Sequence, residues 1–111
     1  MNNYVLTSSA DRDFAGIVAY IAEESPVAAE RLVAEFVAAF ERLAEFPRLG
    51  HVRTELMPSD VRFWVVRPYL VVYRAHEAPI EILRIVSGHR DLIEELTWGV
   101  SEAVEAIPAM A

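Results

Sequence analysis

The stretch of the sequence best equipped for chemistry is His89-Arg90-Asp91, which follows Gly88 at the end of a predicted strand. A histidine transfers protons near neutral pH, and an arginine stabilises negative charge that develops in a reaction. Three consecutive residues cannot all face one pocket in a continuing strand, because neighbouring side chains alternate between its faces. We therefore favour a structural interpretation, in which Arg90 and Asp91 anchor the last strand and Asp91 caps a C-terminal helix. Contact with a partner and catalysis remain as alternatives.

Other patterns typical of catalytic or metal-binding sites are missing from the sequence. The three histidines, His51, His76 and His89, lie in different predicted loops or strand ends, so they lack the spacing of a metal site. The sequence has no glycine-rich phosphate loop, no Ser/His/Asp arrangement and no paired carboxylates in a recognisable site. It therefore predicts neither a metal nor a cofactor.

The basic residues are all arginines, ten in number, in a chain whose formal net charge is −7. An acidic chain is a poor candidate for direct, general binding to nucleic acid. The charge is uneven, however, because residues 47–91 carry seven arginines and five acidic residues. Four of these arginines lie on or beside predicted strands: Arg62, Arg67, Arg74 and Arg84. They form either a solvated edge or a cationic sheet face that meets an acidic partner or target.

The aromatic residues belong either to a core or to a binding platform. We predict that most are core residues: Phe36 and Phe40 on a helix, and Trp64, Tyr69 and Tyr73 on strands. Trp98 lies alone in the C-terminal tail. A solitary tryptophan there is either an interface residue or packs back on the domain.

The spacing of the apolar residues predicts a short strand at 4–7 followed by two helices. The first helix covers about 9–24, with Ser8, Ser9 and Asp11 at its start. Ser25-Pro26 ends it and begins a second helix over about 26–45, which Phe46-Pro47 stops. So short a joint requires an antiparallel helical hairpin.

The second half of the chain predicts a sheet. Residues 47–60 are expected to be loop, and strands rich in β-branched and aromatic residues follow at 61–66, 69–74 and 80–87. Their short links predict an antiparallel meander, and residues 91–96 a short C-terminal helix. One face of the sheet must be covered by the hairpin, so the predicted fold class is α+β with two layers.

Length and composition limit the organisation of the chain. Its 111 residues are enough for one domain, which we place at 1–96, with a tail at 97–111 that is helical or binds a partner. There is no cysteine, no secretory leader and no apolar run of the roughly 18–20 residues that span a bilayer. We therefore expect a cytoplasmic protein without a membrane partner.

The order of these elements and their landmark residues resembles the ParE/RelE superfamily of bacterial toxins, and most closely its ParE branch. The resemblance covers about residues 4–92 and depends on the whole ordered series, because no single motif in it is specific. The matching positions are Tyr4, Leu6, Thr7, Ala10 and Asp13, Ile21, Ala22, Ser25, Pro26 and Ala29, Leu43, Phe46, Pro47, Leu49 and Gly50, Val61, Arg62 and Val66, Tyr69 and Val72–Arg74, and finally Ile80–Ile85 and Gly88–Leu92.

The resemblance implies the toxin of a type II toxin–antitoxin system. It implies inhibition of DNA gyrase without catalysis, and neutralisation by a ParD-like antitoxin in a heterotetramer of two toxins and two antitoxins. The C-terminal segment of the antitoxin is expected to bind partly as a helix in the hairpin groove and partly as a strand on a sheet edge. The antitoxin-binding candidates are Phe36, Phe40, Arg62, Trp64, Arg67, Tyr69, Arg74 and Arg84, and the target-contact candidates are His89, Arg90 and Trp98.

The RelE branch supplies an alternative, a ribosome-dependent mRNA endonuclease, for which Arg62, Arg84 and Arg90 would be the catalytic residues. The sequence departs from that pattern, because Leu70 stands where such enzymes tend to have an arginine. Residues 92–96 also lack the terminal tyrosine, or histidine-tyrosine pair, of those enzymes. A non-toxic interaction module that has kept the fold is the third possibility.

Overall fold

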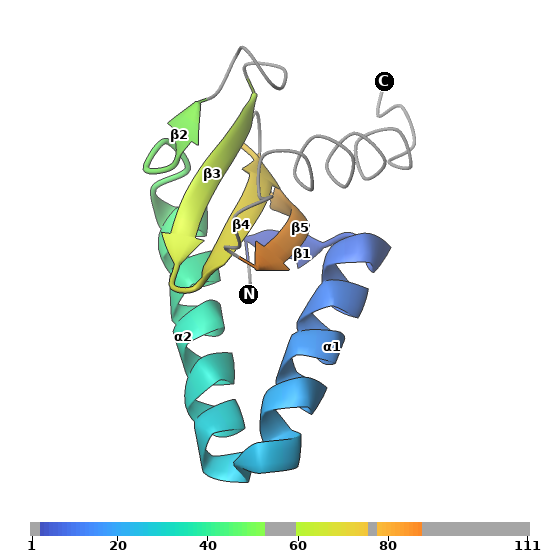
Figure 1. Ribbon diagram of the computed structural model, residues 1–111. Coiled ribbons are helices and arrows are strands. Elements are labelled where there is room, and N and C mark those ends of the chain that lie inside the picture. Colours follow the sequence, from blue (N-terminus) through green and yellow to red (C-terminus); the bar gives the residue numbers. More distant parts are fainter. Residues whose placement is uncertain (1–2, 53–59, 76–77, 88–111) are drawn as a thin grey trace.

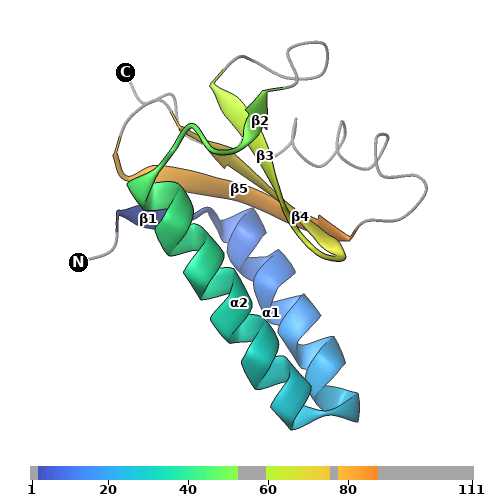
Figure 2. The same ribbon diagram turned by 90° about the vertical axis from the view of Figure 1, so that its left-hand side faces the viewer.

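The computed structural model describes residues 3–52, 60–75 and 78–87. Two helices pack on one face of a five-stranded sheet, and the far end of the helical hairpin projects beyond the sheet (Figures 1 and 2). The elements in chain order are β1 (Tyr4–Leu6), α1 (Ser8–Glu24), α2 (Pro26–Glu45), β2 (His51–Val52), β3 (Val61–Val66), β4 (Tyr69–Arg74) and β5 (Ile80–Ser87). The predicted α+β fold is confirmed.

The sheet has the strand order β1-β5-β4-β3-β2. The predicted meander is present, because β3, β4 and β5 pair antiparallel in sequence order. β1 pairs with β5 in parallel, from Tyr4 opposite Ile80 to Leu6 opposite Ile82. One expectation was wrong: residues 47–60 are not all loop, because His51 and Val52 form an edge strand opposite Phe63 and Arg62. The predicted helix at 91–96 and the tail at 97–111 lie outside the described residues.

A hydroxyl side chain caps the N-terminus of each helix. Ser25 accepts a hydrogen bond from the Ala28 amide at 3.1 Å and donates its own amide to Ile21 at 2.9 Å, so it ends α1 and caps α2. Thr7, rather than Ser8 or Ser9, caps α1 by accepting from the Ala10 amide at 3.1 Å. The helix bounds predicted at Ser25-Pro26 and Phe46 are confirmed.

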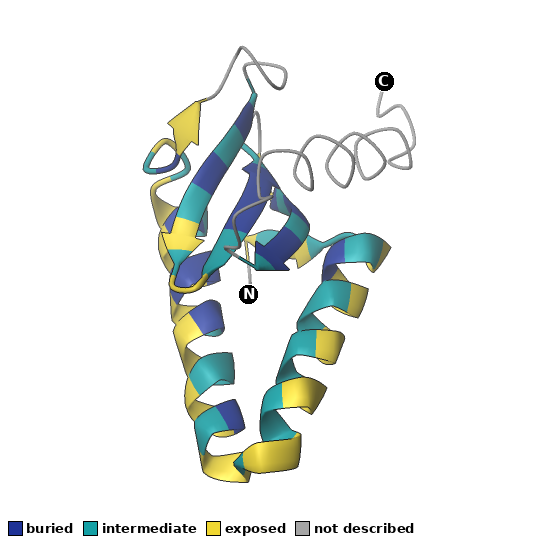
Figure 3. Ribbon diagram, viewed as in Figure 1, coloured by how far each residue is buried: buried dark blue, intermediate teal, exposed yellow. Residues whose placement is uncertain are grey.

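The core lies between α2 and the helix-facing side of the sheet (Figure 3). Phe36 and Phe40 are 0% and 1% exposed, and Phe14 packs on both rings, with centroids 5.4 and 6.1 Å away. The ring centroids of Tyr69 and Phe36 are 5.5 Å apart, so Tyr69 packs β4 against the helical layer. The core residues are Ala10, Phe36, Phe40, Leu43, Val71, Tyr73, Ile80, Ile82 and Ile85.

Tyr73 fixes the loop that follows α2. Its side chain is fully buried, and its hydroxyl donates to the Pro47 carbonyl at 2.7 Å and accepts from the Gly50 amide at 2.8 Å. Arg62 on β3 donates to the Gly50 carbonyl at 2.8 Å and to the Arg48 carbonyl at 3.3 Å. These bonds hold the turn after α2 against β3 and β4, which places β2 at the sheet edge. We call residues 47–50 with Tyr73 and Arg62 the Tyr73 lock.

The Tyr73 lock is expected to open at alkaline pH. Burial raises the pKa of Tyr73 above its ordinary value of 10.0, and the Gly50 amide and the Arg62 charge only partly oppose this shift. The folded chain therefore holds the proton more tightly than the unfolded chain does. This contribution to stability is complete below pH 10.0 and is lost as the pH rises through the raised pKa.

Urea unfolding between about pH 8 and 12 would measure this loss, and tyrosines are the main groups that titrate there because the chain has no lysine and no cysteine. Tyr73→Phe should be less stable by about 1–2 kcal/mol at neutral pH and should show a flatter alkaline decline. Tyr20→Phe is the matched control, because Tyr20 is 68% exposed. An unchanged alkaline decline in Tyr73→Phe would contradict this assignment.

Candidate functional site

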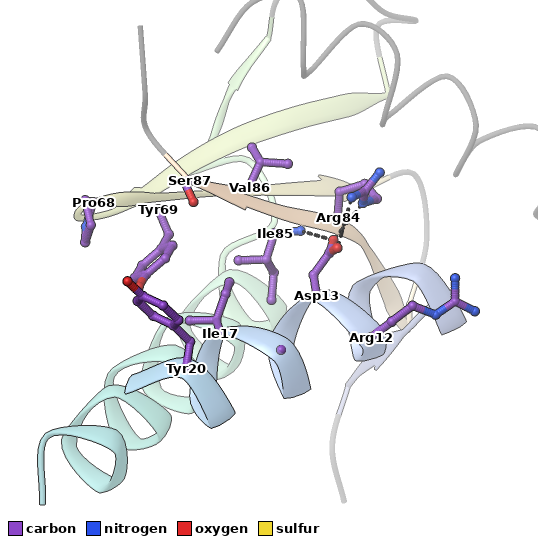
Figure 4. A pocket seen from close by; sticks show the side chains of 11 residues that line it. Arg12, Asp13, Ile17, Tyr20, Pro68, Tyr69, Arg84, Ile85, Val86 and Ser87 are labelled. Carbon is purple, nitrogen blue, oxygen red and sulfur yellow. Dashed lines mark hydrogen bonds and ion pairs between the residues drawn. The ribbon is translucent and has the colours of Figure 1, made fainter. Parts of the chain in front are cut away.

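A groove of about 680 Å³ lies between α1 and β5 and reaches the turn between β3 and β4 (Figure 4). It exists because β1 has three residues and β5 has eight, so β1 covers only the first part of the β5 edge. After Leu6 the chain turns at Thr7 into α1, which runs alongside the rest of that edge. The groove is lined by Arg12, Asp13, Gly16, Ile17, Tyr20, Pro68, Tyr69 and Ile85 with their β5 neighbours Arg84, Val86 and Ser87.

Side chains from the start of α1 satisfy part of the β5 edge. Thr7 donates its hydroxyl to the Leu83 carbonyl at 3.0 Å. Asp13 accepts from the Ile85 amide at 3.0 Å. An uncovered strand edge is a template for pairing with another chain. These two contacts therefore block strand addition at Leu83 and Ile85 unless a partner displaces them.

Asp13 and Arg84 form the charged end of the groove (Figure 4). The Arg84 Nε and Nη2 atoms donate to the two Asp13 carboxylate oxygens at 2.6 and 2.9 Å, in a bidentate pair. The two side chains are 22% and 16% exposed, so the pair is largely removed from solvent. Arg12 is exposed beside it.

The other end of the groove is aromatic and apolar. Figure 4 shows Tyr20 and Tyr69 together near Pro68, with Ile17 between them and the charged end. Tyr20 is 68% exposed, and a large, rigid ring left in solvent on a helix is typical of an interface residue. The groove therefore offers one apolar end and one net positive end to a ligand segment.

The four predicted sheet arginines do not form one cationic face. Arg62 belongs to the Tyr73 lock, Arg67 is exposed in the β3–β4 turn, and Arg84 pairs with Asp13. The Nε atom of Arg74 lies 3.3 Å from the Asp60 Oδ2 atom, and its Nη1 atom lies 3.7 Å from the Glu81 Oε1 atom, so the two carboxylates offset its charge. Of these four arginines, only Arg84 lines the groove.

The predicted aromatic contacts divide in the same way. Phe36 and Phe40 are buried, which leaves no surface for an antitoxin, and we do not retain them as contact residues. Trp64 is partly buried against the core. Among the predicted aromatic residues that the structure describes, only Tyr69 lines the groove. His89, Arg90 and Trp98, the target-contact candidates, lie outside the described residues.

Arg62 and Arg84 do not converge on a catalytic centre. Arg62 pairs across the sheet with Tyr73, and Arg84 pairs with Val72, its neighbour on β4. The two arginines are therefore on strands that β4 separates, and they reach different elements: Arg62 the loop after α2, and Arg84 the Asp13 side chain of α1. Among the described residues, no group of histidine and acidic side chains is arranged to hold a metal. No helix in that part of the chain is both long and apolar enough to cross a membrane.

Sequence reasoning missed Pro68, the β5 residues Ile85, Val86 and Ser87, and above all the groove residues of α1: Arg12, Asp13, Gly16, Ile17 and Tyr20. For Asp13 and Gly16, the sequence contained a signal that could have identified them. Asp13 belongs to the landmark series of the toxin superfamily, and Gly16 is a glycine inside a predicted helix, where it lowers stability. The groove itself could not be predicted from the sequence, because it depends on where β1 ends along β5.

Three comparisons place the chain among known proteins. Residues 4–92 match the family model of the ParE toxin of type II toxin–antitoxin systems, parDE. Toxin ParE3 of Caulobacter vibrioides is 42% identical over 57 residues, a match that spans 51% of this chain and 56% of that protein. Toxin RelE2 of the same organism is 34% identical over 85 residues, which cover 77% of this chain and 93% of that protein.

The fold is also similar to that of a solved structure. A chain of the chromosomal ParDE TA system from P. aeruginosa superposes with a TM-score of 0.64 at 25% identity, over 80% of this chain and 98% of that one. The match therefore includes both the helical hairpin and the sheet that border the groove. Since the family model also spans both, this chain belongs to the ParE toxin family of type II toxin–antitoxin systems.

Proposed function

We propose that this protein is a cytoplasmic toxin that inhibits DNA gyrase by binding rather than by catalysis. Family membership supports the toxin role. The observation that favours a non-catalytic action is the placement of Arg62 and Arg84. Each is engaged in structural hydrogen bonds with a different element, and β4 lies between their strands. Cleavage of RNA without a metal needs several cations that converge on one phosphate.

The proposed partner is a ParD-like antitoxin, with two copies of each protein in the complex. Its C-terminal segment is proposed to occupy the groove between α1 and β5, with Tyr20 and Tyr69 at the apolar end and Arg12 near the Asp13–Arg84 pair. The matched structure is that of a ParDE TA system, which supports an antitoxin partner. Of the sheet residues that the sequence suggested as antitoxin contacts, Tyr69 and Arg84 remain in this proposal, because both line the groove.

The second candidate is a ribosome-dependent mRNA endonuclease. The similarity to Toxin RelE2, which covers 93% of that protein, favours keeping it. In this case Arg90 would have to supply the catalytic cation together with residues other than the engaged Arg62 and Arg84.

Pulse labelling of DNA and protein synthesis separates the two candidates. Within minutes of inducing the chain alone in bacteria, we expect DNA synthesis to fall first while protein synthesis continues. Purified gyrase should then lose supercoiling activity when the chain is added, and co-expression of the small protein encoded beside the toxin gene should restore growth. An early fall in protein synthesis with cleaved mRNA would instead establish the endonuclease. If neither synthesis changes with soluble, folded chain, the protein is a non-toxic interaction module.

A further inference from the structure

Gly16 is a residue that the fold itself does not require. It lies near the middle of α1, where glycine destabilises a helix relative to alanine. A Cβ atom built on it meets no atom of the described residues within 4 Å, so packing against that part of the chain does not exclude a side chain. No glycine in the described part of the chain has a positive φ, so the backbone does not demand glycine either. The described part of the chain therefore does not require a glycine here, and the reason for one must lie elsewhere.

The position of Gly16 indicates what that reason is. It lines the groove, and it follows Asp13 by three residues and precedes Tyr20 by four. Residues at these spacings share one face of a helix. Gly16 thus lies between the charged end and the aromatic end of the groove. The missing side chain leaves the α1 backbone bare at the point where a ligand segment would pass from one end to the other.

We propose that Gly16 is the point at which the antitoxin backbone crosses α1, and that it is a specificity-determining residue of the toxin. The proposal rests on the proposed function, in which an antitoxin segment occupies this groove. Glycine permits a close approach of two backbones that any side chain would prevent. A partner segment with a longer side chain at the crossing would be excluded by the same closeness.

The chemistry of the segment follows from the ends of the groove. Among the described residues, the charged side chains that line it are Arg12, Arg84 and Asp13, which together carry one net positive charge on a chain of net charge −7. A complementary segment places an acidic side chain near Arg12 and an apolar side chain between Tyr20 and Tyr69. Between its acidic and its apolar side chain, the partner segment presents a small residue to Gly16.

The test uses the full chain and the full-length antitoxin encoded beside the toxin gene. Gly16→Gln should raise the Tm of the free toxin by about 2–6 °C, because glycine is replaced by a good helix former with open space around it. The same variant should bind the antitoxin about tenfold more weakly or worse, and Gly16→Ala should lie between it and the wild type. Ala15→Gln is the matched control, since Ala15 is exposed on the same helix but does not line the groove.

A second pair of variants tests the charge of the segment. Arg12→Gln should weaken binding several-fold and reduce its dependence on salt, whereas Arg31→Gln, an exposed arginine on α2 outside the groove, should do neither. Wild-type affinity in Gly16→Gln would overturn the crossing at Gly16, and wild-type affinity in Arg12→Gln would overturn the acidic contact. Failure of the wild-type chain itself to bind the antitoxin would overturn the proposed function, and the crossing with it.

Discussion

Replacing Gly50 by alanine is expected to lower the free energy of unfolding by about 3 kcal/mol. The added Cβ would lie 2.5 Å from the Tyr73 hydroxyl oxygen, and 2.7 and 2.9 Å from two ring carbons. The ring is fully buried and cannot move aside, because its hydroxyl is bonded to Pro47 and Gly50. The methyl group must therefore displace the loop and break the hydrogen bonds of the Tyr73 lock.

Urea unfolding of Gly50→Ala and Gly16→Ala gives an internally matched comparison. Both variants add one methyl group to a glycine, but Gly50 is buried under Tyr73 and Gly16 is surrounded by open space. We expect opposite signs, with Gly16→Ala more stable by about 0.5–1 kcal/mol. Combining Gly50→Ala with Tyr73→Phe should cost less than the sum of the single changes, since they disturb the same bonds. A Gly50→Ala variant as stable as the wild type would mean that the loop moves without cost.

The elements that the sequence predicted well are those whose ends are encoded locally. Ser25-Pro26 carries a capping hydroxyl and a proline at the first helical position, and Phe46-Pro47 stops the same helix. The apolar stripe between them identifies α2 without reference to the rest of the chain. By contrast, β2 has two exposed residues and no apolar alternation. It is a strand because the Tyr73 lock holds the preceding loop against β3, a contact with residues distant in the sequence.

The site was less predictable than the fold for a related reason. Arginine identifies a residue that will form an ion pair or bind an anion, but the sequence does not indicate which partner it will have. Arg84 pairs with Asp13 across 71 positions, and Arg62 bonds to the backbone carbonyls of Arg48 and Gly50. The groove also depends on the length of β1 relative to β5, which follows from pairing and not from composition.

Loss of the Asp13 carboxylate should be the most damaging single change in the groove. Asp13→Ala is expected to lower the free energy of unfolding by about 2–3 kcal/mol. It removes the bidentate partner of Arg84, whose side chain is only 22% exposed, and it removes the acceptor of the Ile85 amide. Asp11→Ala is the control, because Asp11 is exposed in the first turn and should lose only the helix-dipole contribution of about 0.5 kcal/mol.

A double-mutant cycle with Arg84→Ala separates the ion pair from the amide contact. Removing both side chains avoids leaving the Arg84 charge without the Asp13 carboxylate, so the double variant should be less destabilised than the two single changes predict, with a coupling energy of about 1–2 kcal/mol. Asp13→Ala alone should also associate with itself more readily, since it uncovers the β5 edge at Ile85. A coupling energy near zero would mean that the pair contributes little to the groove.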